Sequence, residues 1–401
     1  MQAKRGIKLE YATGLTAEYI LLLLIVFFTA FQLSGYVSMT FLATFLVFAL
    51  MMISYLKTCE VSAVLLLLVF LSFYNVAANA LFSSQAQIGF SYFKKYIMFI
   101  CTMFYFYSAV ELKISDKMKK ILVGLPILMG ALLIISYYFF DNRVMIAHSI
   151  TLGFVNSNFT GMWLVHILLY AIYGLVESRK IPIKLFCLAM ALLCAQFIYM
   201  TYARSAFLGL FMFTAMLVLG FFLREKAVSR PVLIGIAILP LVLALLYLAL
   251  GSSRWLAETF SFLVREGKKL NARSELWLVA LDSARRNPIL GNYSGVSNGA
   301  GFSQLHNTHI DVLCSYGVFP LALFVYALVE IMLKAARKIR SASQYIAFCA
   351  FTAIIVLGTF EAAIVAGSTG LYFLSGGFLF LTCMEPKKDR PGVPTQAKLQ
   401  G

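Results

Sequence analysis

The chain has 401 residues, 61% of them hydrophobic and 12% charged, and its formal net charge at pH 7 is +16. Soluble domains carry about 25% charged residues, so this composition excludes a single water-soluble core and indicates that lipid solvates much of the chain. Apolar runs of about 20 residues match the thickness of a bilayer, whereas a β-barrel would show alternating segments of about ten residues. The sequence therefore predicts an all-α, polytopic integral membrane protein.

Twelve candidate transmembrane helices follow one another along the chain. They are Ala17–Gly35, Val37–Leu56, Val61–Leu81, Tyr96–Leu112, Ile121–Phe140, Phe159–Val176, Leu185–Met200, Ala206–Leu223, Pro231–Leu250, Val312–Leu333, Tyr345–Ala366 and Gly370–Cys383. The first follows a basic stretch, as in a signal peptide, but no clean A-x-A cleavage site comes after it. We therefore expect it to be retained as an anchor.

The basic residues are explained by membrane topology rather than by a nucleic-acid partner. With cytoplasmic N- and C-termini, short inside loops hold most of the 33 Lys and Arg residues, as the positive-inside rule requires. The seven cysteines lie in spans or at their inner ends, so neither a disulfide framework nor a cysteine metal site is expected. The sequence has no D-x-D pair and no H-E-x-x-H motif, so no metal or other cofactor is expected.

Residues 1–401 are expected to form one membrane domain, because no internal repeat or long linker divides them. The largest predicted external loop is 251–305, between the ninth and tenth spans, and its basic residues outnumber its acidic ones. This excess opposes the positive-inside trend and suggests an anionic ligand, with Arg265 and Lys269 as candidate contacts. Thr259–Pro288 has apolar residues near a 3.6-residue period, which predicts a helix. That helix is expected either to lie on the membrane surface or to be solvated.

Two polar clusters precede this loop on the same predicted external side. In GFVNSNFTG (Gly153–Gly161), Asn156 and Asn158 are either turn and helix-cap residues or amide donors to a glycan or phosphate. In TYARSAFLGL (Thr201–Leu210), Arg204 and Ser205 precede a span. The arginine either extends to the membrane interface or forms an anion site with the serine and the helix N-terminus.

Two further clusters lie within the loop and after it. Arg273 begins the helix predicted in the loop and is placed to bind phosphate oxygens with two parallel hydrogen bonds. The stretch GFSQLHNTHIDVLCSYGVFP then brings His306, Asn307 and His309 to the start of the tenth span. An imidazole at this boundary is a candidate general base near neutral pH, and the alternative is a structural histidine.

Two more ionisable residues lie inside predicted spans. Glu361 belongs to the eleventh span, and an intramembrane carboxylate is costly. It is therefore either a functional residue or half of a structural ion pair. His166, in the sixth span, is expected to be a core residue.

Together these residues favour chemistry at the external membrane surface without a nucleotide. Arginine guanidinium groups match phosphate geometry, and the membrane setting implies that a lipid carries the phosphate. Arginines that stabilise a departing lipid diphosphate, with a histidine that takes a proton from an attacking hydroxyl, would perform a glycosyl transfer. A transporter or flippase is the alternative from another class, although such proteins place polar residues near the bilayer midplane and often contain repeats.

Four segments resemble, in their order, the O-antigen ligase and Wzy-type polysaccharide polymerase superfamily of bacterial envelopes. These segments are GFVNSN, ARSAFLGL, ARSELW followed by NPILGN, and HNTHIDVLCSYGVFP. The resemblance implies a GT-C-like, metal-independent glycosyltransferase of the bacterial cytoplasmic membrane whose donor and acceptor are undecaprenyl-diphosphate-linked glycans. It further implies that Arg204 and Arg273 engage the diphosphate, and that His306 is the base or binds the acceptor.

The resemblance leaves several points open. His309 stands where such proteins commonly carry an aromatic or aliphatic residue, so either histidine is a candidate base, and Pro320 stands where the family often has Gly. A polymerase joins repeat units, whereas a ligase moves the finished chain to lipid A core or another acceptor. The GFVNSNFTG segment favours the polymerase. Membrane lipids and a chain-length regulator protein are the other candidate partners.

Overall fold

The computed structural model describes residues 52–53, 55–56, 59–82, 90–139, 145–146, 149–152, 157–223, 228–250, 272–291, 305–361 and 369–384. The helices in these ranges are α3 (Ala63–Phe82), α4 (Phe90–Glu111), α5 (Asp116–Phe139), α6 (Ser157–Glu177), α7 (Ile181–Thr201), α8 (Arg204–Leu223), α9 (Arg230–Leu250), α11 (Ala272–Arg286), α13 (Thr308–Tyr316), α14 (Val318–Ala336), α15 (Ala342–Leu357) and α16 (Thr369–Cys383). Two short antiparallel strands, β1 (Met145–Ile146) and β2 (Ser149–Ile150), form a hairpin before α6.

This architecture confirms the prediction of an all-α polytopic membrane protein. Six of the described helices are long and apolar enough to cross a membrane, and four shorter ones are also apolar. The first predicted span, nearly all of the second and most of the loop 251–305 lie outside the described residues. The helix predicted within that loop is present as α11.

Three predicted boundaries are wrong in instructive ways. The tenth span, predicted as Val312–Leu333, is divided at Gly317 into the short helix α13 and the longer α14. The eleventh span was expected to run to Ala366, but α15 ends at Leu357, so Glu361 lies in the turn that follows the helix. Asn158 lies inside the first turn of α6 and not at its cap. The hydropathy of the sequence does not change at these points, whereas a helix begins or ends at each of them.

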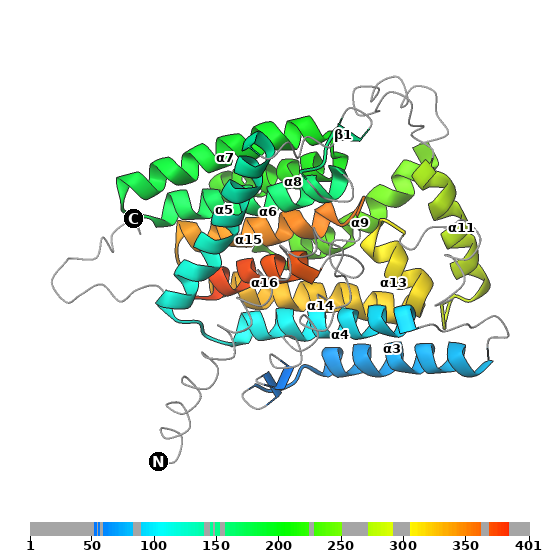
Figure 1. Cartoon of the computed structure of the whole chain (residues 1–401). Helices are drawn as coiled ribbons and strands as arrows, with labels where there is room; N and C mark the ends of the chain where they lie inside the picture. Colours follow the sequence, from blue (N-terminus) through cyan, green and yellow to red (C-terminus); the bar gives the residue numbers. More distant parts are fainter. Residues whose placement is uncertain are drawn as a thin grey trace, which may run out of the picture.

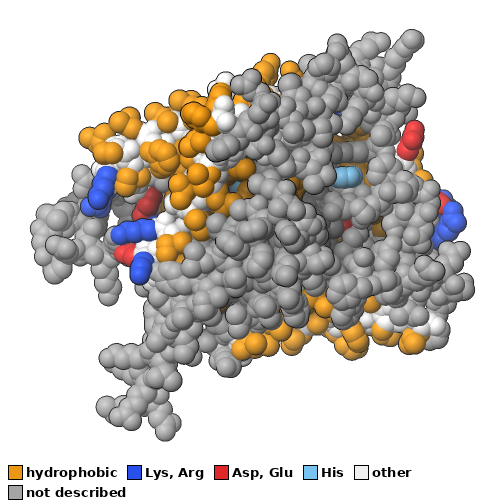
Figure 2. Space-filling model, viewed as in Figure 1, with side chains coloured by type: hydrophobic (Ala, Val, Ile, Leu, Met, Phe, Trp, Pro, Cys, Tyr) orange, Lys and Arg blue, Asp and Glu red, His pale blue; other side chains and the backbone are white. Residues whose placement is uncertain are grey.

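The helices form a bundle in which α6 and α15 are central (Figure 1). Every side chain of α15 from Ala347 to Leu357 is buried. By contrast, α3, α5, α7 and α8 each expose several large aliphatic or aromatic side chains, and hydrophobic side chains cover much of the described surface in Figure 2. Helices that face lipid need such an apolar exterior, since the bilayer interior offers polar groups no partners.

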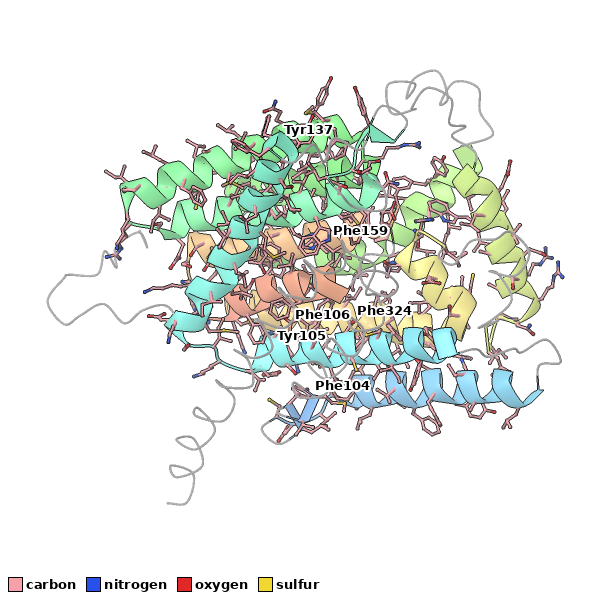
Figure 3. All side chains as sticks on the ribbon, viewed as in Figure 1. Phe104, Tyr105, Phe106, Tyr137, Phe159 and Phe324 are labelled. Atoms are coloured by element: carbon pink, nitrogen blue, oxygen red, sulfur yellow. The ribbon has the colours of Figure 1, made fainter. Side chains whose placement is uncertain are left out.

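Three consecutive aromatic residues on α4 tie this helix to different neighbours (Figure 3). The Tyr105 ring stacks on Phe373 of α16 at a centroid distance of 5.7 Å, and its hydroxyl donates to the Phe373 carbonyl at 3.0 Å. Phe106 meets Phe351 of α15 edge-on at 5.4 Å. Aromatic pairs in these geometries contribute about 0.5–1.5 kcal/mol beyond their buried area, so α4 is held in the middle of the bundle mainly by aromatic packing.

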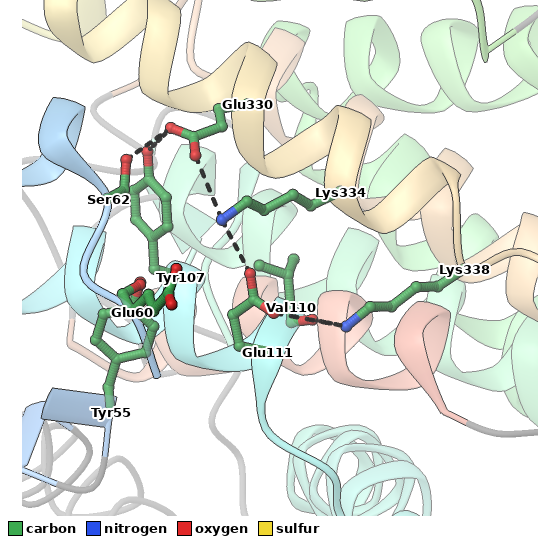
Figure 4. Close-up of polar contacts among 9 residues, drawn as sticks. All are labelled: Tyr55, Glu60, Ser62, Tyr107, Val110, Glu111, Glu330, Lys334 and Lys338. Atoms are coloured by element: carbon green, nitrogen blue, oxygen red, sulfur yellow. Dashed lines mark hydrogen bonds and ion pairs between the residues drawn. The ribbon is translucent and has the colours of Figure 1, made fainter. Parts of the chain in front are cut away.

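One end of the bundle, which we call the Lys334 end, carries a network of ion pairs (Figure 4). Lys334 of α14 bridges Glu111 at 2.9 Å and Glu330 at 3.3 Å. Glu330 also accepts hydrogen bonds from the hydroxyls of Ser62 at 2.9 Å and Tyr107 at 2.6 Å. These contacts fasten α14 to α4 and to the segment that leads into α3.

The opposite end, which we call the His306 end, is where α8, α13 and α14 begin and α15 ends. The antiparallel packing of α8 and α15 shows this, because Gly209 lies against Leu357 near one end and the Tyr345 hydroxyl donates to Met216 O at 2.6 Å towards the other. Most of the residues predicted to do chemistry belong to the His306 end.

Candidate functional site

An ion pair between His306 and Glu361 forms the centre of the candidate site. His306 Nδ1 lies 2.9 Å from Glu361 Oε2, and the side chains are 27% and 6% exposed. Since a carboxylate only accepts hydrogen bonds, this contact assigns the proton to Nδ1. The other nitrogen, Nε2, has no hydrogen-bond partner among the described residues, and the imidazole is partly accessible.

The backbone of His306 has a positive φ of 51°. Residues other than glycine rarely adopt this conformation, which persists only where surrounding contacts enforce it. Those contacts come from Asn307, which is fully buried. Its Oδ1 accepts the Ile310 amide at 2.8 Å and so caps α13, while its Nδ2 donates to Thr359 O at 2.8 Å. One side chain therefore joins the start of α13 to the turn that carries Glu361.

A second link runs between the same two segments. The Thr308 amide donates to Gly358 O at 3.0 Å. Gly358 allows this approach, because a Cβ at that position would lie 3.0 Å from Thr308 Oγ1. Two hydrogen bonds thus join the segment that carries His306 to the segment that carries Glu361, and they hold the pair in place. Both the oxygen and the nitrogen of the Asn307 side-chain amide are occupied within the protein.

His309 is placed differently from His306. It is fully buried, its Nε2 donates to Ala237 O at 2.7 Å, and its ring meets Phe324 edge-on at 5.4 Å. Burial lowers the pKa of His309 to about 4, against the smaller opposing effect of its hydrogen bond to Ala237. A neutral imidazole without access to solvent cannot exchange protons with an incoming hydroxyl, so the geometry favours His306 as the base.

The carbonyl that binds His309 lies beside a proline in α9. Pro240 has no N–H to donate within the helix, and a proline disturbs the turn before it. Asn307 Nδ2 also approaches Pro240 O, at 3.2 Å. The part of α9 around Pro240 therefore supplies acceptors for two side chains of the 306–309 segment.

Helix α11 packs against α13 and α9 through its apolar face. Leu276, Trp277, Ala280 and Ala284 are buried there. The indole Nε1 of the fully buried Trp277 donates to Leu305 O at 2.7 Å, next to His306 in the chain. Arg273 lies in the first turn of α11, one turn before Trp277; its side chain is outside the described part. The Trp277 bond thus ties the turn after Arg273 to the backbone beside His306.

Two glycines make the α11–α13 contact possible at its other end. Gly317 has φ +92°, and a Cβ there would lie 2.1 Å from Ile289 O. Gly291 has φ +70°, and its Cβ would lie 2.7 Å from the Gly317 amide. Val318 N donates to Pro288 O at 2.8 Å across the same contact. We call the residues Pro288–Gly291 and Tyr316–Val318 the glycine junction. It joins the NPILG and SYG segments, which the sequence singled out separately.

Arg204 and Ser205 form the first turn of α8 at the His306 end. Arg204 is partly exposed. Ser205 is 1% exposed, and its hydroxyl has no hydrogen-bond partner among the described residues. Because α8 packs antiparallel to α15, this turn lies at the same end of the bundle as Glu361. A positively charged residue and a helix N-terminus therefore stand at the end that carries the His306–Glu361 pair.

Three of the remaining predicted residues are not tested by the structure, and the others lie apart from the His306–Glu361 pair in the chain. Asn156, Arg265 and Lys269 lie outside the described residues, and Asn158 is a partly exposed residue in the first turn of α6. His166 is fully buried in α6 and bonds Met162 O and Ser375 Oγ, at 2.8 and 3.1 Å, as expected of a core residue. Among the described residues no group of three His, Cys, Asp or Glu side chains is placed to hold a metal ion.

Trp277 and Asn75 contribute side-chain contacts to this region, but neither was assigned a role from the sequence, although Trp277 ends the ARSELW segment. Trp277 is one of only three tryptophans, and its position on the predicted apolar face was the available signal. Asn75 is a buried amide in a predicted span, and its polarity was the signal there.

The described part of the molecule is a polytopic α-helical membrane protein with a histidine–carboxylate pair at one end of its bundle, where two arginine-bearing helices also begin. Residues 188–325 match the family described as Wzy_C, O-Antigen ligase. The resemblance to the O-antigen ligase and Wzy-type superfamily is thereby confirmed for this segment, which runs from α7 into α14 and contains Arg204, Arg273 and His306. No curated protein and no solved structure matches the chain. That the fold is GT-C-like therefore stays a prediction.

Proposed function

We propose that the protein is a glycosyltransferase that transfers a glycan from a lipid-diphosphate carrier to a hydroxyl group, at the outer surface of the bacterial cytoplasmic membrane. The observation that carries the proposal is the His306–Glu361 pair, 2.9 Å apart, at the end of the bundle where α8 and α11 begin. The family match is the second support, since members described as O-antigen ligases transfer glycans.

In this proposal His306 is the general base. Its Nδ1 proton is held by Glu361, which leaves Nε2 as the acceptor for a proton. The acceptor hydroxyl attacks the anomeric carbon of the donor sugar, its proton passes to Nε2, and the bond between that carbon and the diphosphate oxygen breaks. The negative charge of Glu361 stabilises the imidazolium that forms, as the third member of a catalytic triad does.

Arg204 and Arg273 would bind the diphosphate that leaves with the lipid. Each lies in the first turn of its helix, where free amide groups and the helix dipole also favour anions. Guanidinium groups bind phosphate oxygens through paired, charge-assisted hydrogen bonds. Such contacts stabilise the charge that develops on the leaving group, so the proposed reaction needs no metal ion. Ser205 offers a further donor beside Arg204.

The structure suggests supporting roles for the neighbouring residues. The Asn307 amide is engaged by backbone contacts, and His309 is fully buried with its Nε2 bonded to Ala237 O, so we assign both to positioning His306. Asn156, Asn158, Arg265 and Lys269 remain candidates for binding the glycan or the diphosphate.

The acceptor defines two versions of this function. We favour a polymerase, whose acceptor is a second lipid-linked repeat unit, because of the GFVNSNFTG segment. The second candidate is a ligase, which would pass the finished chain to lipid A core or another acceptor. The matched family is described as O-antigen ligase, and this match supports both versions equally. The same His306 and arginines would serve either reaction.

The test is incubation of the purified protein with an undecaprenyl-diphosphate-linked repeat unit, with and without a metal chelator. Extension of the glycan that survives the chelator supports a metal-independent polymerase. Transfer only after addition of lipid A core supports the ligase. His306→Ala and Arg204→Ala are expected to insert normally and to abolish transfer. Long polymer made by either variant would exclude the proposed site.

A second experiment, on the lipid-linked glycans of cells that lack the gene, separates an enzyme from a transporter. In cells that lack the gene, single repeat units on the acceptor indicate a lost polymerase, and long chains left on the carrier lipid indicate a lost ligase. Repeat units trapped on the cytoplasmic leaflet would indicate a flippase.

A further inference from the structure

Asn75 of α3 makes contacts that the proposed reaction does not use directly. Its side chain is 4% exposed in the middle of an apolar helix. The Nδ2 group donates to Tyr316 O at the end of α13 and, at 3.2 Å, to Ile289 O in the turn after α11. One amide therefore bridges three elements. The residue lies outside the segment that matches the family.

The two carbonyls that accept from Asn75 both belong to the glycine junction. Tyr316 is the last residue of α13, and Ile289 lies in the turn beyond α11. Carbonyls at helix ends lack the intrahelical partners of interior ones, and in lipid an unpartnered carbonyl is costly. Asn75 satisfies one carbonyl from each segment, at the point where Val318 N also bonds Pro288 O. It acts where the two segments meet.

The position of this bridge has a consequence for the site. Helix α11 runs from Arg273 to the glycine junction, and α13 runs from the residues after His306 to the same junction. At their other ends the two helices are joined by the Trp277 bond to Leu305. The relative placement of Arg273 and His306 is thus fixed at two points, one of which depends on Asn75.

We propose that Asn75 is a positioning residue, which holds α11 against α13 and so sets the distance between the residue that binds the leaving group and the base. This inference rests on the proposed function of Arg273 and His306. A displacement of about 1 Å between reacting groups can lower a rate about 10²-fold, so a bridge distant from the chemistry can still determine kcat.

Ser72 provides a matched comparison within the same helix. It lies one turn before Asn75, is fully buried, and its hydroxyl has no hydrogen-bond partner among the described residues. A general need of α3 for polar side chains would involve both residues, whereas positioning of the junction involves Asn75 alone.

The experiment compares the purified variants Asn75→Leu, Asn75→Gln and Ser72→Ala with the wild-type protein. Leucine has the branched shape of asparagine but donates no hydrogen bond, and glutamine retains the amide. The first readout is kcat and KM for transfer from the lipid-linked donor. The second is independent of activity and uses Cys314, whose thiol donates to Ala280 O at 3.1 Å. In an Ala280→Cys background, the rate of disulfide formation with Cys314 reports the placement of α11 on α13.

Asn75→Leu is expected to lower kcat at least about tenfold with KM changed by less than about twofold, and to slow the disulfide reaction. Asn75→Gln is expected to recover part of both values, and Ser72→Ala to leave both unchanged. Should Asn75→Leu fail to fold, Asn75→Gln against Ser72→Ala carries the same comparison.

Wild-type kcat together with a wild-type disulfide rate in Asn75→Leu would overturn the inference. So would equal losses in Asn75→Leu and Ser72→Ala. If the wild-type protein transfers no glycan, the proposed function fails, and the disulfide rate alone then decides whether Asn75 positions the two helices.

Discussion

Replacing Glu361 by Gln tests the proposed roles of the histidine and the carboxylate most directly. The side chains are nearly equal in shape, so the amide oxygen can still accept the Nδ1 proton of His306 and keep the ring oriented. The negative charge is lost. The variant therefore removes the stabilisation of an imidazolium and leaves the ground-state contact in place.

The size of the effect follows from the geometry of the pair. The two atoms lie 2.9 Å apart, and the Glu361 side chain is only 6% exposed, so solvent screens the interaction little. A hydrogen bond to a charged group contributes about 1.5–3 kcal/mol, and about 1.36 kcal/mol corresponds to a tenfold change in rate. We expect kcat to fall about 10- to 150-fold. KM should stay near the wild-type value, because the charge on His306 develops only in the transition state.

The assay is transfer from a purified lipid-linked donor at saturating and limiting concentrations. Glu330→Gln is the matched control, since Glu330 also accepts hydrogen bonds from neighbouring helices but belongs to the Lys334 end. The control is expected to lower the unfolding temperature and to leave kcat unchanged. Loss of kcat in Glu361→Gln alone then reflects the chemistry and not the fold.

Two results would refute the reasoning. One is a kcat for Glu361→Gln within about twofold of wild type, because the expected decrease is at least about tenfold. The other comes from the double variant with His306→Ala. Residues that act as a unit are strongly non-additive, so the double variant should be no slower than His306→Ala alone. Multiplied losses would show that Glu361 acts without His306.

Three further predictions concern the packing around the pair. Gly317→Ala should destabilise the protein by at least about 2 kcal/mol, because the φ of Gly317 is +92° and an added Cβ would lie 2.1 Å from Ile289 O. The measurement is the unfolding temperature, which should fall; an unchanged temperature would contradict the glycine junction. Trp277→Phe removes the bond to Leu305 O and leaves space where the larger indole was buried. A cost of at least about 1 kcal/mol in unfolding and a lower kcat are expected, and unaltered kinetics would oppose a link to the site. Burial lowers the pKa of His309 to about 4, so below its usual pKa the residue takes up a proton on unfolding, and stability should fall as the pH drops from about 6.5 towards 4. His309→Phe should reduce this dependence of the unfolding temperature on pH. An equal dependence in the variant and the wild type would show that the residue is not buried and neutral.

The spans could be predicted from the sequence because hydropathy and helical period are local properties. Each described helix from α3 to α9 overlaps a predicted span, with ends shifted by a few residues. The break at Gly317 was missed for the same reason, since a window of about 20 residues averages across one glycine. Only the close approach of Ile289 O explains why the chain turns there. That approach is a contact between two segments of the chain that come together only on folding.

The site divides in the same manner. Arg204, Arg273 and His306 could be selected from residue type and position, because arginines on the predicted external side oppose the positive-inside trend and the chain has only four histidines. The partnership of His306 with Glu361 joins residues 55 positions apart, and no local pattern shows it. The contrast between His306 and His309 was equally hidden, since they differ in burial and not in type.

The contacts that hold the site share one physical origin, which also explains why the sequence concealed them. Trp277, Asn307 and Asn75 each donate to backbone carbonyls at helix ends or turns, and His309 donates to one beside a proline in α9. An apolar chain offers a buried donor few side-chain acceptors, and leaving the donor unpaired is costly. For Asn75 and Asn307, acceptors lie at or just after the C-terminal ends of α13, α11 and α15, where carbonyls have no intrahelical partner. The donors can be read from a sequence, but their acceptors become known only when the helix ends are placed.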